Sequence, residues 1–188
     1  MLKKLLVVIS LVIGLSAILV LAGCSSGNTS GVGTYPNGVI ISTGTYPSTA
    51  TTSTGTYQDV VITPTVTNDT VSIPVSTVKS NRNVHFELNS AGGTTSFEAY
   101  ILNNEIQVRA SYCVPCRGTS FTLSGDELIC NNCGTVFNAN NGIGIRGSAS
   151  CQSYPKASVP FTVNGENIIM KISDLQNAFQ NTLSQGLP

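Results

Sequence analysis

Four of the six cysteines in this sequence form two close pairs, Cys113 with Cys116 and Cys130 with Cys133. Two residues separate the members of each pair, so both sulfurs can point to the same side of a turn and bind one metal ion. Two such pairs supply four thiolates, the ligand set of tetrahedral zinc, of rubredoxin-type iron and of iron–sulfur clusters. A fifth cysteine, Cys151, follows farther along the chain. The pattern predicts a metal site made by these five cysteines.

The residue types leave four kinds of site open. An iron–sulfur centre or a single iron ion would transfer electrons, whereas a four-cysteine zinc site would be purely structural. An exchangeable fifth thiolate could instead capture and deliver an ion such as iron or copper. Disulfides are favoured outside the cytoplasm, but the five cysteines beyond Cys24 are an odd number and cannot all pair. Cys151 stays open between an exchangeable ligand or redox thiol and a buried, inert thiol.

Other catalytic chemistry finds little support in the sequence. His85 is the single histidine, and it alternates with Phe86 in an apolar run. We expect it to be a surface or partly buried residue and not a ligand. No second histidine is available as a base, and the glycine-rich stretch 142–147 fits no nucleotide-binding fingerprint because it does not open a helix. We therefore expect an electron carrier or a binding module, and not an enzyme.

The N-terminus carries a targeting signal. Lys3 and Lys4 precede an apolar run over residues 5–22, which ends in the sequence Leu-Ala-Gly-Cys at 21–24. Small residues before a cysteine after such a run resemble the lipobox of bacterial lipoprotein signals. The resemblance implies that residues 1–23 are a signal peptide and that Cys24 carries the lipid. Each buried acyl CH₂ contributes about 0.8 kcal/mol, so two or three chains anchor stably. An uncleaved N-terminal helix is the alternative, and both place the rest of the chain outside the cytoplasm, at the cell membrane.

Residues 24–58 predict a disordered tether. They consist almost wholly of Ser, Thr, Gly, Asn, Tyr and Pro, with a Gly-Thr-Tyr repeat that starts at residues 33, 44 and 55. Such a composition cannot bury enough apolar surface to offset chain entropy, and its mean reach is roughly 30 Å. Without Lys3 and Lys4, seven basic residues face nine acidic ones, a net charge of −2. That balance argues against a nucleic-acid partner.

Residues 59–188 are long enough for one domain with a modest hydrophobic core. Apolar runs predict strands, and the run from Val84 to Leu88 alternates so strictly that we expect a half-buried strand. Turn residues between the runs predict antiparallel hairpins that lead into the cysteine pairs. The expected strands are 60–62, 71–75 with Val78 following, 84–88, 96–102, 105–110, 119–123, 127–129, 161–163 and 168–172.

One helix is expected at the C-terminal end of the chain. Residues 173–176, Ser-Asp-Leu-Gln, match a capping box, in which Ser173 would cap the helix. Leu175, Phe179 and Leu183 would then share one face. The predicted fold class is all-β, a small antiparallel β domain with two cysteine loops and one C-terminal helix.

Several motifs follow one another from about residue 71 to residue 179. They are Ile73-Pro74-Val75, Phe86, the run 105–110 before Cys113, the stretch 125–134, Ile143-Gly144, Cys151, Pro155, Gly165 and the run 168–172. In these motifs the chain resembles the FtrD-like membrane iron–sulfur domain family. It departs from that family at the last cysteine, where Ser148 to Gln152 replace a Gly-Gly-Cys-Asn-Pro run.

The resemblance implies an iron–sulfur centre in a membrane iron-transport or redox system. A membrane iron permease or a redox partner would then be the functional partner, at the extracytoplasmic face of the membrane. A looser likeness to Rieske domains, and to rubredoxin, lies in the strand that delivers a Cys-x-x-Cys-Gly loop and in Phe137 after it. Because all-cysteine ligation lowers the reduction potential relative to two-histidine ligation, we expect a low-potential centre. The alternatives remain a zinc-stapled structural module without redox activity and a metal chaperone.

Overall fold

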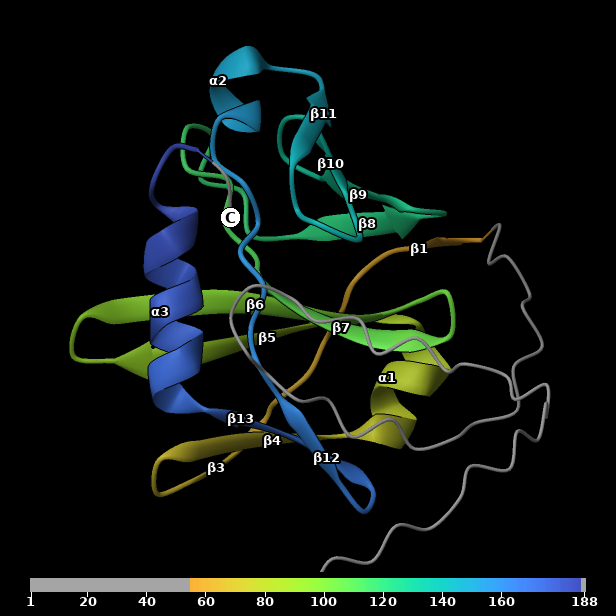
Figure 1. Cartoon of the computed structure of the whole chain (residues 1–188), viewed down its shortest axis with the longest axis vertical. Helices are drawn as coiled ribbons and strands as arrows, with labels where there is room; N and C mark the ends of the chain where they lie inside the picture. Colours follow the sequence, from red (N-terminus) through yellow and green to blue (C-terminus); the bar gives the residue numbers. More distant parts are fainter. Residues whose placement is uncertain (1–54, 187–188) are drawn as a thin grey trace, which may run out of the picture. The chain divides into compact units, whose positions relative to one another are not determined.

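The computed structural model describes residues 55–186, which form three β-sheets and three helices (Figure 1). Nearly all strand pairs are antiparallel, which confirms the predicted all-β class. None of the helices within residues 55–186 has the length and apolar character needed to cross a membrane. The predicted signal peptide, Cys24 and most of the predicted tether lie outside the described residues.

The central sheet has the order β2-β5-β6-β7. Its strands are β2 (Val60–Val61), β5 (Asn83–Ser90), β6 (Gly93–Leu102) and β7 (Glu105–Ala110). The last three form the two predicted hairpins, and β2 adds to β5 in parallel. The expectation of a half-buried strand at 84–88 is wrong, because residues 83–86 are buried on both faces. One face is apolar, while the other presents polar side chains to the sheet that carries the cysteines.

The apolar face of the central sheet packs on a second sheet with the order β12-β13-β4-β3. This sheet consists of β3 (Thr65–Thr67), β4 (Thr70–Pro74), β12 (Thr162–Asn164) and β13 (Asn167–Lys171). Phe86 and Phe97 stack at 5.5 Å between ring centroids in the shared core. Buried side chains from β4 and β13, such as Ile73 and Met170, complete this core.

Helix α1 (Val75–Asn81) replaces the end of a predicted strand. The apolar pattern through Val75 and Val78 predicts an extended segment, but both side chains are buried on one face of a helix, three residues apart. Pro74 ends the strand because it has no N–H to donate, and its φ of −66° and ψ of 134° place it at the N-cap. Arg82 closes the helix in the left-handed conformation.

Helix α3 (Ile172–Thr182) confirms the predicted C-terminal helix, but the capping box does not form. The helix begins one residue before Ser173, with Lys171 at the N-cap and no side-chain cap. Leu175 is fully buried, and the ring of Phe179 meets Phe97 edge-on at 6.4 Å. Tertiary packing of this apolar face therefore stabilises the helix start without a capping side chain.

The third sheet has the order β1-β8-β9-β10-β11 and carries the cysteines. Its strands are β1 (Thr56–Tyr57), β8 (Phe121–Ser124), β9 (Glu127–Cys130), β10 (Val136–Asn138) and β11 (Gly144–Arg146). The β8–β9 hairpin was predicted, whereas β10, β11 and the short helix α2 (Ala149–Gln152) were not. Thr56 and Tyr57, which fall in the predicted tether, pair with β8. Figure 1 shows this sheet and α2 on the opposite side of the central sheet from β4 and β13.

Candidate metal centre

The first cysteine loop, residues 113–118, follows β7 after two connecting residues. The Cys113 N–H donates to the Gly118 carbonyl at 2.7 Å, and the Arg117 N–H donates back to the Cys113 carbonyl at 2.7 Å. Arg117 takes a left-handed φ of 59°, which closes the turn. Position 118 has room only for glycine, because a Cβ there would lie 2.8 Å from the Cys130 sulfur and 3.3 Å from the Cys116 sulfur.

The second cysteine loop, residues 130–135, repeats the hydrogen bonds of the first. The Cys130 N–H donates to the Thr135 carbonyl at 2.9 Å, and the Gly134 N–H donates to the Cys130 carbonyl at 2.9 Å. Gly134 has a left-handed φ of 70°, at the position that Arg117 holds in the first loop. The two pairs are thus presented by two copies of one backbone turn, which explains the spacing of two residues within each pair.

The four paired cysteines converge on one point, as the sequence predicts. Each sulfur lies within 4.8 Å of the other three. The separations across the loops are 3.9 Å for Cys113 to Cys133 and 3.7 Å for Cys116 to Cys130. Four sulfurs at about 2.3 Å from one tetrahedral ion lie roughly 3.8 Å apart, so the spacing matches four ligands of a single ion.

Cys151 lies beside this group and not within it. It sits on α2, is buried, and its sulfur is 3.8 Å from that of Cys133. It does not belong to the set of four sulfurs that all lie within 4.8 Å of one another. The structure therefore places the fifth predicted cysteine beside Cys133 and Cys113, as a neighbour of the group and not as a member of it.

The thiols differ in their affinity for protons. A hydrogen bond from Cys113, together with the N–H groups of Cys133 and Asn132, lowers the pKa of Cys130 to about 5. The same bond to Cys130 raises the pKa of Cys113, and burial raises that of Cys133 to about 11. Burial opposes a lowered pKa at Cys151, but hydrogen bonds from Cys113 and Ser148 outweigh it. The lowered pKa of Cys130 favours the thiolate form there, which is the form that binds metal ions.

Lys156 places a buried positive charge beside the sulfurs, which the sequence analysis did not anticipate. Its side chain is fully buried, and Nζ donates to the carbonyls of Tyr112 at 2.7 Å and Tyr154 at 2.8 Å. Nζ also lies 4.4 Å from the ring centroid of Phe137. Burial lowers its pKa to about 8, and the cysteine thiolates oppose that shift. A lone Lys in a polar loop carries no local signal of burial, so only the fold could reveal it.

The donor set fits an iron–sulfur centre or iron in ligand type and number. Four cysteine thiolates are the ligands of rubredoxin-type iron and of [2Fe–2S] clusters, and Lys156 partly balances their charge. Sulfurs on different irons of a two-iron cluster lie farther apart than sulfurs on one ion. A cluster of that kind therefore requires the sulfurs bound to different irons to lie farther apart than they do here, whereas a single ion fits the spacing as it is.

One side of the sulfur group reaches the surface. Cys116 and Cys133 are partly exposed, while Cys113 and Cys130 are buried. A shallow depression next to the first loop is lined by Arg117, Gly118, Thr119, Ser120, Asn131 and Asn132. The sulfur group therefore lies close to the protein surface on the side of Cys116 and Cys133.

Arg109 joins the central sheet to the cysteine layer. From β7 its guanidinium donates to the Tyr100 hydroxyl at 2.9 Å, to the Lys156 carbonyl at 2.8 Å and to the Asn140 carbonyl. Gly142 packs against this group, because a Cβ there would lie 2.9 Å from Nη1 of Arg109. The loop before β11 and the segment after α2 are thus held on the face of the sheet.

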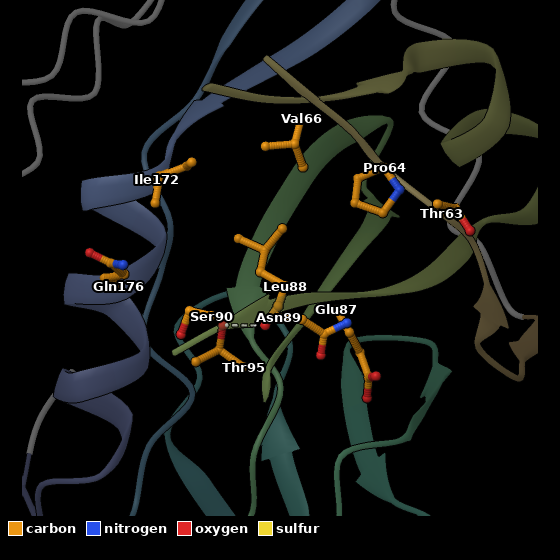
Figure 2. A pocket seen from close by; sticks show the side chains of 10 residues that line it. All are labelled: Thr63, Pro64, Val66, Glu87, Leu88, Asn89, Ser90, Thr95, Ile172 and Gln176. Carbon is orange, nitrogen blue, oxygen red and sulfur yellow. Dashed lines mark hydrogen bonds between the residues drawn. The ribbon is translucent and has the colours of Figure 1, made fainter. Parts of the chain in front are cut away.

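His85 is buried, which corrects the expectation of a surface or partly buried residue. It is 5% exposed and lies on the polar face of the central sheet, outside the group of four sulfurs. Its Nε2 is 3.4 Å from the Glu87 carboxylate, which also lines a groove of about 320 Å³ between β3, β5 and α3. Figure 2 shows this groove, with the Glu87 carboxylate directed away from Leu88 and Val66. The groove is lined by neither cysteine nor histidine and is separate from the metal centre.

Two solved structures are similar to this chain at low sequence identity. The first is described as a complex of reduced oxygenase and oxidized ferredoxin in carbazole 1,9a-dioxygenase, with 17% identity and a TM-score of 0.45 over 55% of this chain and 94% of that one. The second is Sphingomonas yanoikuyae B1 ferredoxin, with 18% identity and a TM-score of 0.42 over 52% of this chain and 92% of that one. No curated protein matches the sequence significantly.

A family model matches residues 78–181, more than half of the chain, and its description is membrane iron–sulfur containing protein FtrD-like. The match spans β5, β6 and β7 of the central sheet, both cysteine loops, Cys151 and most of α3. It confirms the resemblance that the sequence motifs carry. Its description agrees with the convergence of four thiolates at one point. The chain belongs to the FtrD-like family of membrane iron–sulfur-containing proteins.

Proposed function

We propose that this protein is a lipid-anchored electron carrier whose iron–sulfur or iron centre is held by Cys113, Cys116, Cys130 and Cys133. The convergence of these sulfurs within 4.8 Å, in a family described as iron–sulfur containing, is the observation that carries the proposal. The partly exposed edge at Cys116 and Cys133 supports electron exchange with a partner protein. A centre of this kind accepts one electron and passes it on without binding a substrate.

The working location is the extracytoplasmic face of the cell membrane, with Cys24 as the anchor. The lipobox at residues 21–24 and the uncharged segment before Asp59 support this proposal. The partner that fits the family is a membrane iron permease or its redox partner, to which the centre would supply reducing equivalents. Iron uptake by cells that carry Cys133→Ser in place of the wild-type protein should then fall, with Cys151→Ser as the comparison.

Anaerobic purification of the full chain with metal and sulfide analysis tests the centre itself. Two irons and two sulfides per chain, with visible absorption that bleaches on reduction, identify a cluster. One iron without sulfide identifies a rubredoxin-type ion. We expect Cys133→Ser to lose the metal and the colour, and Cys151→Ser to keep both, since Cys151 lies outside the group of four.

A structural zinc site is the second candidate function. The near-equal sulfur spacings of 3.7 and 3.9 Å favour a single tetrahedral ion, and zinc in a four-cysteine site is closed and redox-inactive. One zinc per chain, no iron and a colourless protein would establish it and rule out electron transfer.

A further inference from the structure

Three side chains that could bind a metal ion meet on the polar face of the central sheet, outside the cysteine group. Asp59 lies in the connection between β1 and β2, His85 on β5 and Glu98 on β6. His85 and Glu98 are directly opposite each other in the register of the two strands. One ligand atom from each of the three residues lies within 4.8 Å of the other two.

These side chains are buried. His85 is 5% exposed and Glu98 is 2% exposed, and the side chain of Asp59 is 9% exposed. Both carboxylates accept a hydrogen bond from the start of β8 in the cysteine sheet. Ser120 Oγ donates to Asp59 Oδ1 at 2.8 Å, and the Phe121 N–H donates to Glu98 Oε1 at 3.0 Å. The three groups are therefore fixed by two different sheets.

The imidazole of His85 presents a free nitrogen to this group. Nε2 lies 3.4 Å from Glu87 Oε1, and with its proton donated there Nδ1 carries a lone pair. Nδ1 is buried without a hydrogen-bond partner and faces Asp59 Oδ2 at 3.9 Å. A histidine oriented by a carboxylate on its far nitrogen is the usual arrangement of a metal-bound imidazole.

The arrangement is costly without a cation. A buried nitrogen without a partner has lost its hydrogen bond to water and gained none in exchange. Burial and the nearby charge of Asp59 raise the pKa of Glu98 well above its ordinary value, and Lys156 is the weakest of the contributions that act on it. A divalent ion among the three side chains would bind the free nitrogen and balance both carboxylates.

We propose that Asp59, His85 and Glu98 form a second metal site, which binds a divalent ion through two carboxylates and one imidazole. Oxygen and nitrogen donors without a thiolate suit ions such as Mn²⁺ and Fe²⁺, in contrast to the four-cysteine site. Water completes the coordination, because the three side chains leave positions open. The site stands on its own geometry and does not depend on the identity of the cysteine-bound metal.

The second site adjoins the first through β8. Glu98 accepts a hydrogen bond from the N–H of Phe121, and Phe121 is paired with Cys130 in the β8–β9 hairpin. One strand residue therefore connects a ligand of the proposed site to a ligand of the thiolate centre. An ion at the second site would therefore lie where the central sheet meets the sheet that carries the cysteines.

Titration of the full chain with Mn²⁺, after its cysteine centre has been loaded, tests the proposal. Mn²⁺ prefers carboxylate donors to thiolates, and binding removes the electron paramagnetic resonance signal of the free ion. We expect one Mn²⁺ per chain. Asp59→Asn and Glu98→Gln should each lower the affinity for Mn²⁺ about tenfold or more, the size of effect seen when groups that support a metal site are removed.

Asp69→Asn is the matched control, since Asp69 is an exposed carboxylate in the β3–β4 turn. It should leave Mn²⁺ binding unchanged. Visible absorption and circular dichroism report whether each variant is folded, and Asp59→Asn, at the least buried position, carries the test if Glu98→Gln does not fold. Equal binding by wild type and variants, or no Mn²⁺ binding up to millimolar concentration, overturns the proposal.

Discussion

At the residue scale, the two cysteine loops use the same hydrogen bonds with different residues at the left-handed position. Gly134 adopts its φ of 70° without a steric penalty, whereas Arg117 adopts 59° with a Cβ in place. Such a conformation in a residue other than glycine costs of the order of 1 kcal/mol. The loop at 113–118 keeps this conformation through its two backbone hydrogen bonds, and Gly118 leaves space for the sulfurs of Cys116 and Cys130.

Gly118→Ala should remove metal binding while the protein stays folded. The added methyl would lie 2.8 Å from the Cys130 sulfur, so the sulfur has to move away from the common point. We expect iron or zinc content to fall several-fold in metal analysis of the purified chain. Gly125→Ala, which has a left-handed φ of 61° but no atom within 4 Å of the new methyl, is the control and should retain its metal.

Lys156→Met should lower the reduction potential of the centre. A positive charge stabilises the more negative reduced state, and a charge a few ångströms away contributes about 1–3 kcal/mol at an effective dielectric of ~20. We expect a fall of roughly 50–100 mV, since ~59 mV corresponds to a tenfold change for one electron. Electrochemistry on adsorbed protein measures it, with the exposed Lys171→Met as control. An unchanged potential would show that Lys156 serves packing alone.

At the scale of elements, the central sheet is buried on two faces that differ in kind. Its apolar face packs on β4 and β13, and its polar face carries Tyr100, Arg109 and Glu98 toward the cysteine layer. A strict apolar–polar alternation normally indicates one face in water. Here the cysteine layer covers the polar face and supplies its hydrogen-bond partners, which is why the expectation of a half-buried β5 was wrong.

Arg109→Met should destabilise the domain by about 3 kcal/mol, because it leaves carbonyl acceptors buried without a donor. The buried carbonyl of Lys156 and the partly buried carbonyl of Asn140 lose their charged partner. Urea unfolding followed by circular dichroism measures the change. The exposed Arg117→Met should stay within about 0.5 kcal/mol of wild type. A similar midpoint for both variants would contradict the role of Arg109 as the link between the layers.

At the scale of the whole molecule, the domain that holds the centre begins earlier than the composition of the chain suggests. Tyr57 pairs with Leu123 of β8, so the last Gly-Thr-Tyr copy joins the sheet that carries the cysteines. Asp59 follows directly and reaches the proposed second site. A segment of tether-like composition therefore ends in the sheet that carries the cysteines, next to both candidate sites.

Intact mass spectrometry of the chain produced in a bacterial host tests the proposed anchor. The wild type should lack residues 1–23 and carry an acyl mass on Cys24, and Cys24→Ser should retain the leader without acyl groups. Cys151→Ser controls for a general effect of losing a thiol and should be processed like the wild type. A wild-type chain that keeps Met1 and carries no lipid would contradict the lipobox.

The sequence by itself predicted the four cysteines whose sulfurs the structure brings together, the hairpin between their two loops and the family. Pairs such as Cys113–Cys116 are local signals, because ligand spacing and turn residues act over a few positions. It could not determine that Lys156 and His85 are buried, nor that Val75 begins a helix. Burial depends on which segments pack together. The residues from Pro74 to Val78 are compatible with both a strand and a helix, and packing of Val75 and Val78 in the core selects the helix. Only the tertiary structure brought Asp59, His85 and Glu98 together, since 39 positions separate the first from the last and no local pattern spans that distance.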